Sequence, residues 1–186
     1  MTNKIPRLDF DDLEQGLADA LRPRYERLGY LGEFFRCLGH QPRPLRAFVE
    51  YTETAKGELD QKMVEVVALS AATHLDNAYE RNQHERLCVR LGYGRDWVTE
   101  IEKLDPEGAD GLSDDERTVQ RYVIDMLVRG GKDTNKGLEA VIDALGYEKA
   151  IAVMMVIGRY IMHAMMVHSL ELAPPVPSIY EDGFNG

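Results

Sequence analysis

Three ionisable side chains are spaced so that they could share a proton. Glu80 and His84 are four residues apart in the segment 77–84 (NAYERNQH), so on a helix they lie on the same face. Glu65 lies in the apolar run 63–69 (MVEVVAL), where a carboxylate has no evident structural purpose. Because the two segments are adjacent, we expect their helices to pack antiparallel and bring the three groups together. Two carboxyls and an imidazole are suited to general acid–base catalysis.

Each residue of this group has an expected role. Among valine and alanine neighbours, desolvation should raise the pKa of Glu65, so that it can hold a proton near neutrality. His84 is the natural proton shuttle, and Glu80 could orient its ring or stabilise its charged form. Asn77 could donate its amide to a developing oxyanion. The alternative is structural: an exposed Glu80–His84 pair worth about 0.2–0.5 kcal/mol, with Glu65 neutralised by an arginine.

Helical periodicity dominates the chain, which predicts an all-α fold of seven to nine helices. Pro23 should bend or restart the first helix, and Pro42 and Pro44 should follow the end of the second. Ser113 and Glu116 form a capping box that opens a helix. Residues 178–186 should form an extended or loose arm. The expected helices cover residues 12–28, 31–38, 45–55, 60–73, 77–91, 95–104, 114–128, 136–145 and 148–171.

Composition excludes several classes of protein. The chain has 186 residues, with 22 Lys and Arg against 32 Asp and Glu, and this net charge of −10 disfavours nucleic-acid binding. Two cysteines, far apart, argue against a disulfide framework and favour a cytoplasmic protein.

Residues 1–10 lack the apolar core of a signal peptide. Residues 150–170 are apolar but interrupted by Arg159, His163 and His168, so we expect a buried helix there and no membrane span. A buried Arg159 would need an ion-pair partner.

The pattern Glu65-x11-Asn77-x-Tyr79-Glu80-x3-His84 resembles the core motif of the carboxymuconolactone decarboxylase superfamily, which includes alkylhydroperoxidase D. The thiol peroxidase branch has a motif similar to Glu-x11-Cys-x2-Cys-x3-His, so its two cysteines fall on Asn77 and Glu80 here. Cysteine-free members resemble this chain in their Tyr-Glu-Trp string, with Arg81 in place of the tryptophan.

The resemblance implies an alkylhydroperoxidase D-like helical bundle. It covers residues 45–172, which leaves residues 1–44 as an N-terminal helical extension and residues 173–186 as a C-terminal tail. It further implies a decarboxylase, lyase or isomerase acting on a small oxygenated molecule with neither metal nor organic cofactor. A homo-oligomer, trimer or hexamer, is expected by the same resemblance. Tyr79 and Cys88, on the same segment as His84, are candidate pocket residues.

Two other functions stay open. The first is a hydroperoxide reductase of the alkylhydroperoxidase D type. Without the cysteine pair, this activity would have to use Cys88 alone, activated by His84 four residues before it. The second is a helical scaffold that binds a small molecule without turning it over.

Overall fold

The structure is a computed structural model, and it describes residues 4–181 and 184. In these residues it contains nine α-helices, one short 3-10 helix and no strand, which confirms the predicted all-α class. The α-helices are α1 (Gln15–Leu28), α2 (Glu33–Leu38), α3 (Pro42–Gly57), α4 (Gln61–His74), α5 (Ala78–Arg90), α6 (Arg95–Glu102), α7 (Asp114–Arg129), α8 (Asn135–Leu145) and α9 (Tyr147–Ser169).

Side-chain caps fix where several helices begin, among them α4, α5 and α7. Asp60 accepts a hydrogen bond from the Met63 amide at the start of α4. Asn77 caps α5 in the same way, and the predicted capping box of Ser113 and Glu116 opens α7. Each cap satisfies an amide that the first helical turn leaves unpaired.

The prolines mark the start of one helix and interrupt none. Pro42 and Pro44 follow the end of α2, as predicted, but α3 begins at Pro42 and not at residue 45, because the missing amide of a proline in the first turn costs no helical hydrogen bond. Pro23 lies inside α1, which continues through it without a restart. Because Pro23 has no amide hydrogen, the Asp19 carbonyl four residues earlier has no helical donor. Both residues lie on the exposed side of α1, where water can solvate that carbonyl.

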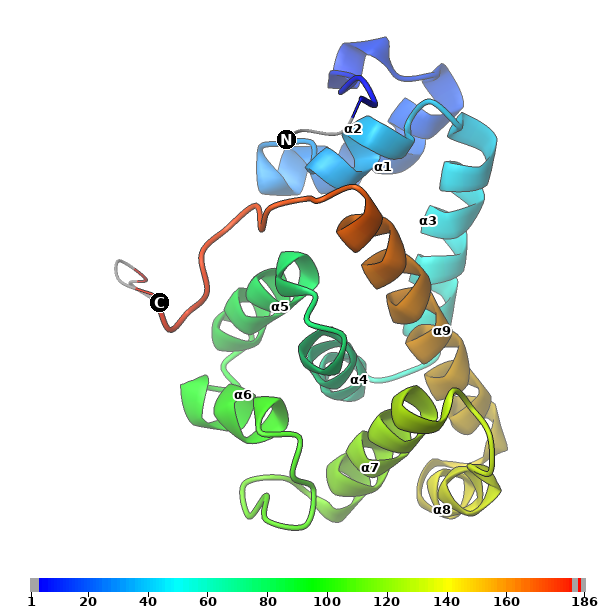
Figure 1. The fold of residues 1–186 in the computed structure, drawn as a ribbon, viewed down its shortest axis with the longest axis vertical. Helices are drawn as coiled ribbons and strands as arrows, with labels where there is room; N and C mark the ends of the chain where they lie inside the picture. The colour runs from blue at the N-terminus through cyan, green and yellow to red at the C-terminus, as the bar shows by residue number, and fades with distance from the viewer. Residues whose placement is uncertain (1–3, 182–183, 185–186) are drawn as a thin grey trace.

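Helix α4 lies at the centre of the main hydrophobic core, surrounded by α5, α7 and α9 (Figure 1). Ten consecutive residues from Met63 to Ala72 are buried, which is typical of a helix covered on all sides. Glu65 belongs to this run and is fully buried. A carboxylate at this depth needs a charged or hydrogen-bonding partner.

A second hydrophobic cluster joins α1 and α2 to α3 and to the end of α9. Leu17, Phe34, Leu45 and Leu170 are among its members. The predicted boundary at residue 44 therefore falls within α3, at a place where both sides share a core. The division of the chain into three parts stays a prediction.

The C-terminal segment is bound more firmly than the expected arm. It crosses from the end of α9 toward α5 (Figure 1). The Ser178 hydroxyl and the Ile179 amide both donate to the Glu85 carboxylate, at 2.5 and 2.8 Å. Ile179 is buried. Up to residue 181 this segment is non-helical, as expected for an extended arm, but it is not loose, because Glu85 supplies a buried acceptor. Residues 182, 183, 185 and 186 lie outside the described part.

Within the described residues, only α9 has the length and hydropathy of a membrane span. More than half of its most apolar window (56%) is buried inside the protein, where it packs against α3, α4 and α8. This arrangement is that of a core helix.

Candidate active site

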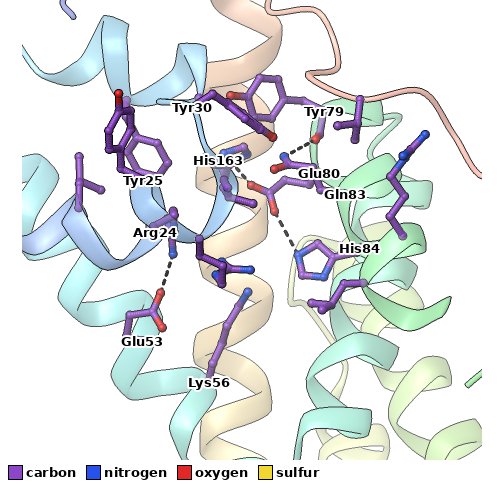
Figure 2. A pocket seen from close by; sticks show the side chains of 18 of the residues that line it. Arg24, Tyr25, Tyr30, Glu53, Lys56, Tyr79, Glu80, Gln83, His84 and His163 are labelled. Carbon is purple, nitrogen blue, oxygen red and sulfur yellow. Dashed lines mark hydrogen bonds and ion pairs between the residues drawn. The ribbon is translucent and has the colours of Figure 1, made fainter. Parts of the chain in front are cut away.

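A cavity of about 510 Å³ opens between α1, α3, α4, α5 and α9 (Figure 2). Glu65, Glu80 and His84 lie in its wall, so the structure brings together the three groups that the spacing predicted. The chain as a whole is acidic, but the cavity is not. Its described lining contains six arginine and lysine side chains: Arg24, Arg27, Lys56, Arg86, Arg90 and Arg159. Its carboxylates are Glu53, Glu65 and Glu80.

Glu65 and His84 form the closest contact in this group. The Glu65 Oε2 atom lies 2.5 Å from His84 Nδ1, and both residues are buried. The second carboxylate oxygen of Glu65 accepts a hydrogen bond of 2.6 Å from the Gln61 side chain, one turn earlier on α4. Because a short contact between an acceptor carboxylate and an imidazole nitrogen requires a proton between them, Nδ1 carries a hydrogen.

The predicted rise in the pKa of Glu65 is wrong. Burial alone would raise it, as predicted, but the charge and hydrogen bond of His84 outweigh burial and lower it. For His84, burial would lower the pKa, but the charge of the Glu65 carboxylate and the hydrogen bonds that the ring donates to Glu65 and Glu80 raise it. Glu65 is therefore an ionised carboxylate, and the proton expected on Glu65 resides on the imidazole. The sequence suggested burial of Glu65 but not the pairing that reverses its effect.

The other ring nitrogen of His84 faces two oxygens. Glu80 Oε2 lies 3.2 Å from Nε2, and the Tyr160 hydroxyl lies 2.9 Å from it. The pKa of Tyr160 is raised well above its ordinary value, first by burial, so this group remains a phenol. With acceptors at both nitrogens, His84 is held as an imidazolium between the two carboxylates.

Glu80 connects His84 to α9. Its Oε1 atom lies 2.9 Å from His163 Nε2 and 3.3 Å from Arg159 Nη2 (Figure 2 shows the histidine contacts). Burial would raise the pKa of Glu80, but Arg159 and His163 hold it well below its ordinary value. The predicted ion-pair partner of Arg159 is thus Glu80. His163, expected to be a core or interface histidine, is buried, and burial lowers its pKa.

Asn77 lies outside the cavity wall, although it is buried. Its side-chain oxygen caps α5, and its Nδ2 lies 3.4 Å from His163 Nδ1. An amide that donates to Nδ1 leaves the proton of a neutral His163 on Nε2, where it can point at Glu80. The position of Asn77 therefore fits a group that orients His163 better than an oxyanion donor.

The two candidate pocket residues are placed differently. Tyr79 lines the cavity, and its hydroxyl accepts a hydrogen bond from the Phe34 amide at 3.2 Å. Cys88 is fully buried, lies outside the cavity wall and places its sulfur 3.7 Å from Glu65 Oε2. Burial and then the Glu65 charge raise the pKa of the Cys88 thiol far above its ordinary value. A thiolate is the reactive form of cysteine, so this environment suppresses its reactivity.

Two residues of the site were missed by sequence reasoning. Tyr160 lies on α9, distant in sequence from the 65–84 segment, and Lys56 lies near the end of α3, directly before α4. Tyr160 directly follows Arg159, and this polar pair within a mostly apolar segment was the sequence signal that could have indicated a site residue there. Lys56 gave none, because lysine near the end of a helix is ordinarily a solvated cap. In the described residues, no group of three His, Cys, Asp or Glu side chains is arranged to hold a metal ion.

The sequence matches no protein-family model, and no curated protein matches it. Solved structures do share its fold. An uncharacterised peroxidase-related protein with an alkylhydroperoxidase AhpD core, from Ralstonia eutropha, has a TM-score of 0.78 at 14% identity, over 91% of this chain and 90% of that one. The apo debrominase Bmp8 has a TM-score of 0.81 at 14% identity, over 95% and 94% of the two chains. A cysteine-to-alanine variant of Bmp8 in complex with 2,3,4-tribromopyrrole has a TM-score of 0.79 at 14% identity, over 93% and 92%.

These likenesses establish the architecture. The chain has the alkylhydroperoxidase D-like helical fold, as the Glu65-to-His84 motif predicted. A shared fold hosts different activities, so the chemistry has to be argued from the site.

Proposed function

We propose that this protein is an acid–base enzyme in which His84 exchanges a proton with a small oxygenated molecule bound in the cavity. The supporting observation is the 2.5 Å contact between Glu65 Oε2 and His84 Nδ1 at the cavity wall. Glu65 keeps the imidazole charged and fixes its orientation, and Nε2 is the nitrogen that gives and recovers the proton. Glu80 and Tyr160 hold that proton when no substrate accepts it.

The reaction class that fits this role is a decarboxylation or an isomerisation. Each passes through a carbanion or enolate, to which a proton must be delivered at carbon. An imidazolium donor beside Arg159 would stabilise the negative charge that develops on the substrate. The proposed chemistry uses no metal or organic cofactor.

The proposal is tested by hydrogen–deuterium exchange at carbon. Wild-type protein in D2O is incubated with a panel of small oxo acids and lactones, and loss of the C–H signal is followed by proton NMR. We expect exchange above the buffer rate for at least one compound, and we expect Glu65→Gln to abolish it. Tight binding of an apolar compound with no exchange in the panel would instead favour the non-catalytic binder.

A hydroperoxide reductase dependent on Cys88 is disfavoured by the burial of that thiol. We therefore expect Cys88→Ala to leave proton exchange within about 3-fold of wild type, because the thiol does not line the cavity. Peroxide consumption, measured with hydrogen peroxide and dithiothreitol, should be negligible in both proteins. A peroxidase rate that disappears in Cys88→Ser would overturn this expectation, and Cys37→Ala is the matched control.

We also propose that the protein is a cytoplasmic homo-oligomer. An exposed apolar stripe along α9 supports assembly, because Ile151, Met155, Met162 and Met165 recur at helical spacing on its outer face. Light scattering after size exclusion should give a mass above the 21.1 kDa of one chain. A monomeric mass for the wild type would contradict assembly. An oligomeric mass that Met162→Glu leaves unchanged would contradict assembly through this face.

A further inference from the structure

Lys56 lies in the cavity wall opposite the acid–base group. It extends from α3 into the space between the Arg24–Glu53 ion pair and His84 (Figure 2). Its Nζ atom lies 5.2 Å from the centre of the Tyr160 ring. No described carboxylate is within ion-pair distance of this ammonium, so Lys56 is not committed to a structural salt bridge.

The charges around Lys56 come from four helices. Arg24 (α1) and Arg159 (α9) are cationic, while Glu65 (α4) and Glu80 (α5) are anionic. Burial and then Arg159 lower the pKa of Lys56 to about 8, against a smaller opposing effect of the two glutamates. Above this pH the amine is mostly neutral and nucleophilic, and below it the amine becomes protonated and the nucleophile is lost. A desolvated lysine beside another cation is the arrangement in which amines attack carbonyl carbon.

Arg159 provides a second, independent observation. It is only 5% exposed and lines the same cavity, yet its Nε and Nη1 atoms have no hydrogen-bond partner in the described protein. Its Nη2 alone contacts Glu80. Buried donors without acceptors are uncommon, and a guanidinium edge matches a carboxylate in geometry and charge.

We propose that Lys56 forms an imine with a small oxo acid whose carboxylate binds Arg159. The Lys56 nitrogen adds to the carbonyl carbon, a proton moves from nitrogen to oxygen, and the carbinolamine loses water to give the imine. Hydrolysis by water reverses these steps and restores the amine. The protonated imine withdraws electrons from the neighbouring carbon, which eases loss of a proton or of carbon dioxide there. Only this last step rests on the proposed role of His84, since imine formation needs Lys56 and Arg159 alone.

The test is reductive trapping. Wild-type protein is incubated with pyruvate and sodium cyanoborohydride at pH 7.5, and alkylated lysines are located by peptide mass spectrometry. Lys56 is expected to be labelled about 10-fold faster than exposed Lys136, because burial lowers the pKa of the Lys56 amine to about 8 and Arg159 holds the oxo acid in the same cavity. Its labelling rate should rise with pH to half its maximum near pH 8. Labelling of Lys56 no faster than Lys136 would overturn the proposal.

Two comparisons separate the parts of the proposal. Acetone replaces pyruvate to test Arg159: the ratio of Lys56 to Lys136 labelling should be several-fold lower with acetone, and an equal ratio would overturn the carboxylate site.

His84→Ala should keep the Lys56 labelling even if it abolishes exchange. Trapping without exchange in the wild type would thus refute the acid–base function alone, and exchange without trapping would refute the imine alone. Lys56→Arg should remove the label, whereas Lys136→Arg should leave it.

Discussion

Replacing His84 with alanine is expected to lower the rate of proton exchange by about 10²–10⁴-fold, the range typical of a lost general acid or base. The imidazole is the group that carries the mobile proton, and no other described histidine contacts Glu65. Glu65→Gln should reduce the rate comparably, because glutamine cannot hold the ring as an imidazolium. Rates are measured by NMR on any compound that the wild-type protein exchanges.

Folding must be shown to survive these changes. Circular dichroism and urea denaturation should show both variants folded, although less stable. His74→Ala is the matched control, since this half-exposed histidine at the end of α4 lies outside the cavity wall, and it should retain wild-type exchange. Full activity in both His84→Ala and Glu65→Gln would refute the acid–base assignment.

Replacing Arg159 with methionine is expected to lower the free energy of unfolding by about 3 kcal/mol. The change leaves the buried Glu80 carboxylate without its guanidinium partner, and an uncompensated buried charge costs about 3–5 kcal/mol. Two histidines still contact Glu80, which places the expected value at the lower end. Urea denaturation measures the loss.

A double-mutant cycle separates the charge from the packing. Glu80→Gln combined with Arg159→Met should be more stable than the sum of the two single changes predicts, because both charges are then removed together. Arg121→Met is the control: its partner Glu107 is exposed, and such pairs contribute about 0–1 kcal/mol. A loss below 1 kcal/mol for Arg159→Met, with additive single changes, would contradict a buried ion pair.

The sequence predicted the parts of this structure that local patterns encode. Ser113 and Glu116 form the predicted capping box at the start of α7. The 3.6-residue period placed Glu80 and His84 on one face, and the apolar run around Glu65 indicated its burial. These features depend on neighbours in the chain, so one sequence is enough to infer them.

What the sequence did not predict depends on contacts between distant helices. Tyr160 reaches His84 from a helix 76 residues away in the chain, and no local pattern encodes that contact. The lowered pKa of Glu65 likewise follows from its pairing with His84 and not from its apolar neighbours. The neighbours of Lys56 come from four helices, so its reactivity is a property of the assembled cavity.

The most direct test of the proposed acid–base role is the titration of His84. Its ring nitrogens are followed by ¹⁵N NMR across pH in the wild type and in Glu65→Gln. We predict that the wild-type pKa of His84 lies above the ordinary value of 6.5 and falls when Glu65 becomes neutral, because the Glu65 carboxylate stabilises the charged ring. A His84 that titrates at or below 6.5, unchanged by Glu65→Gln, would show that Glu65 does not hold the imidazolium and would contradict the proposed chemistry.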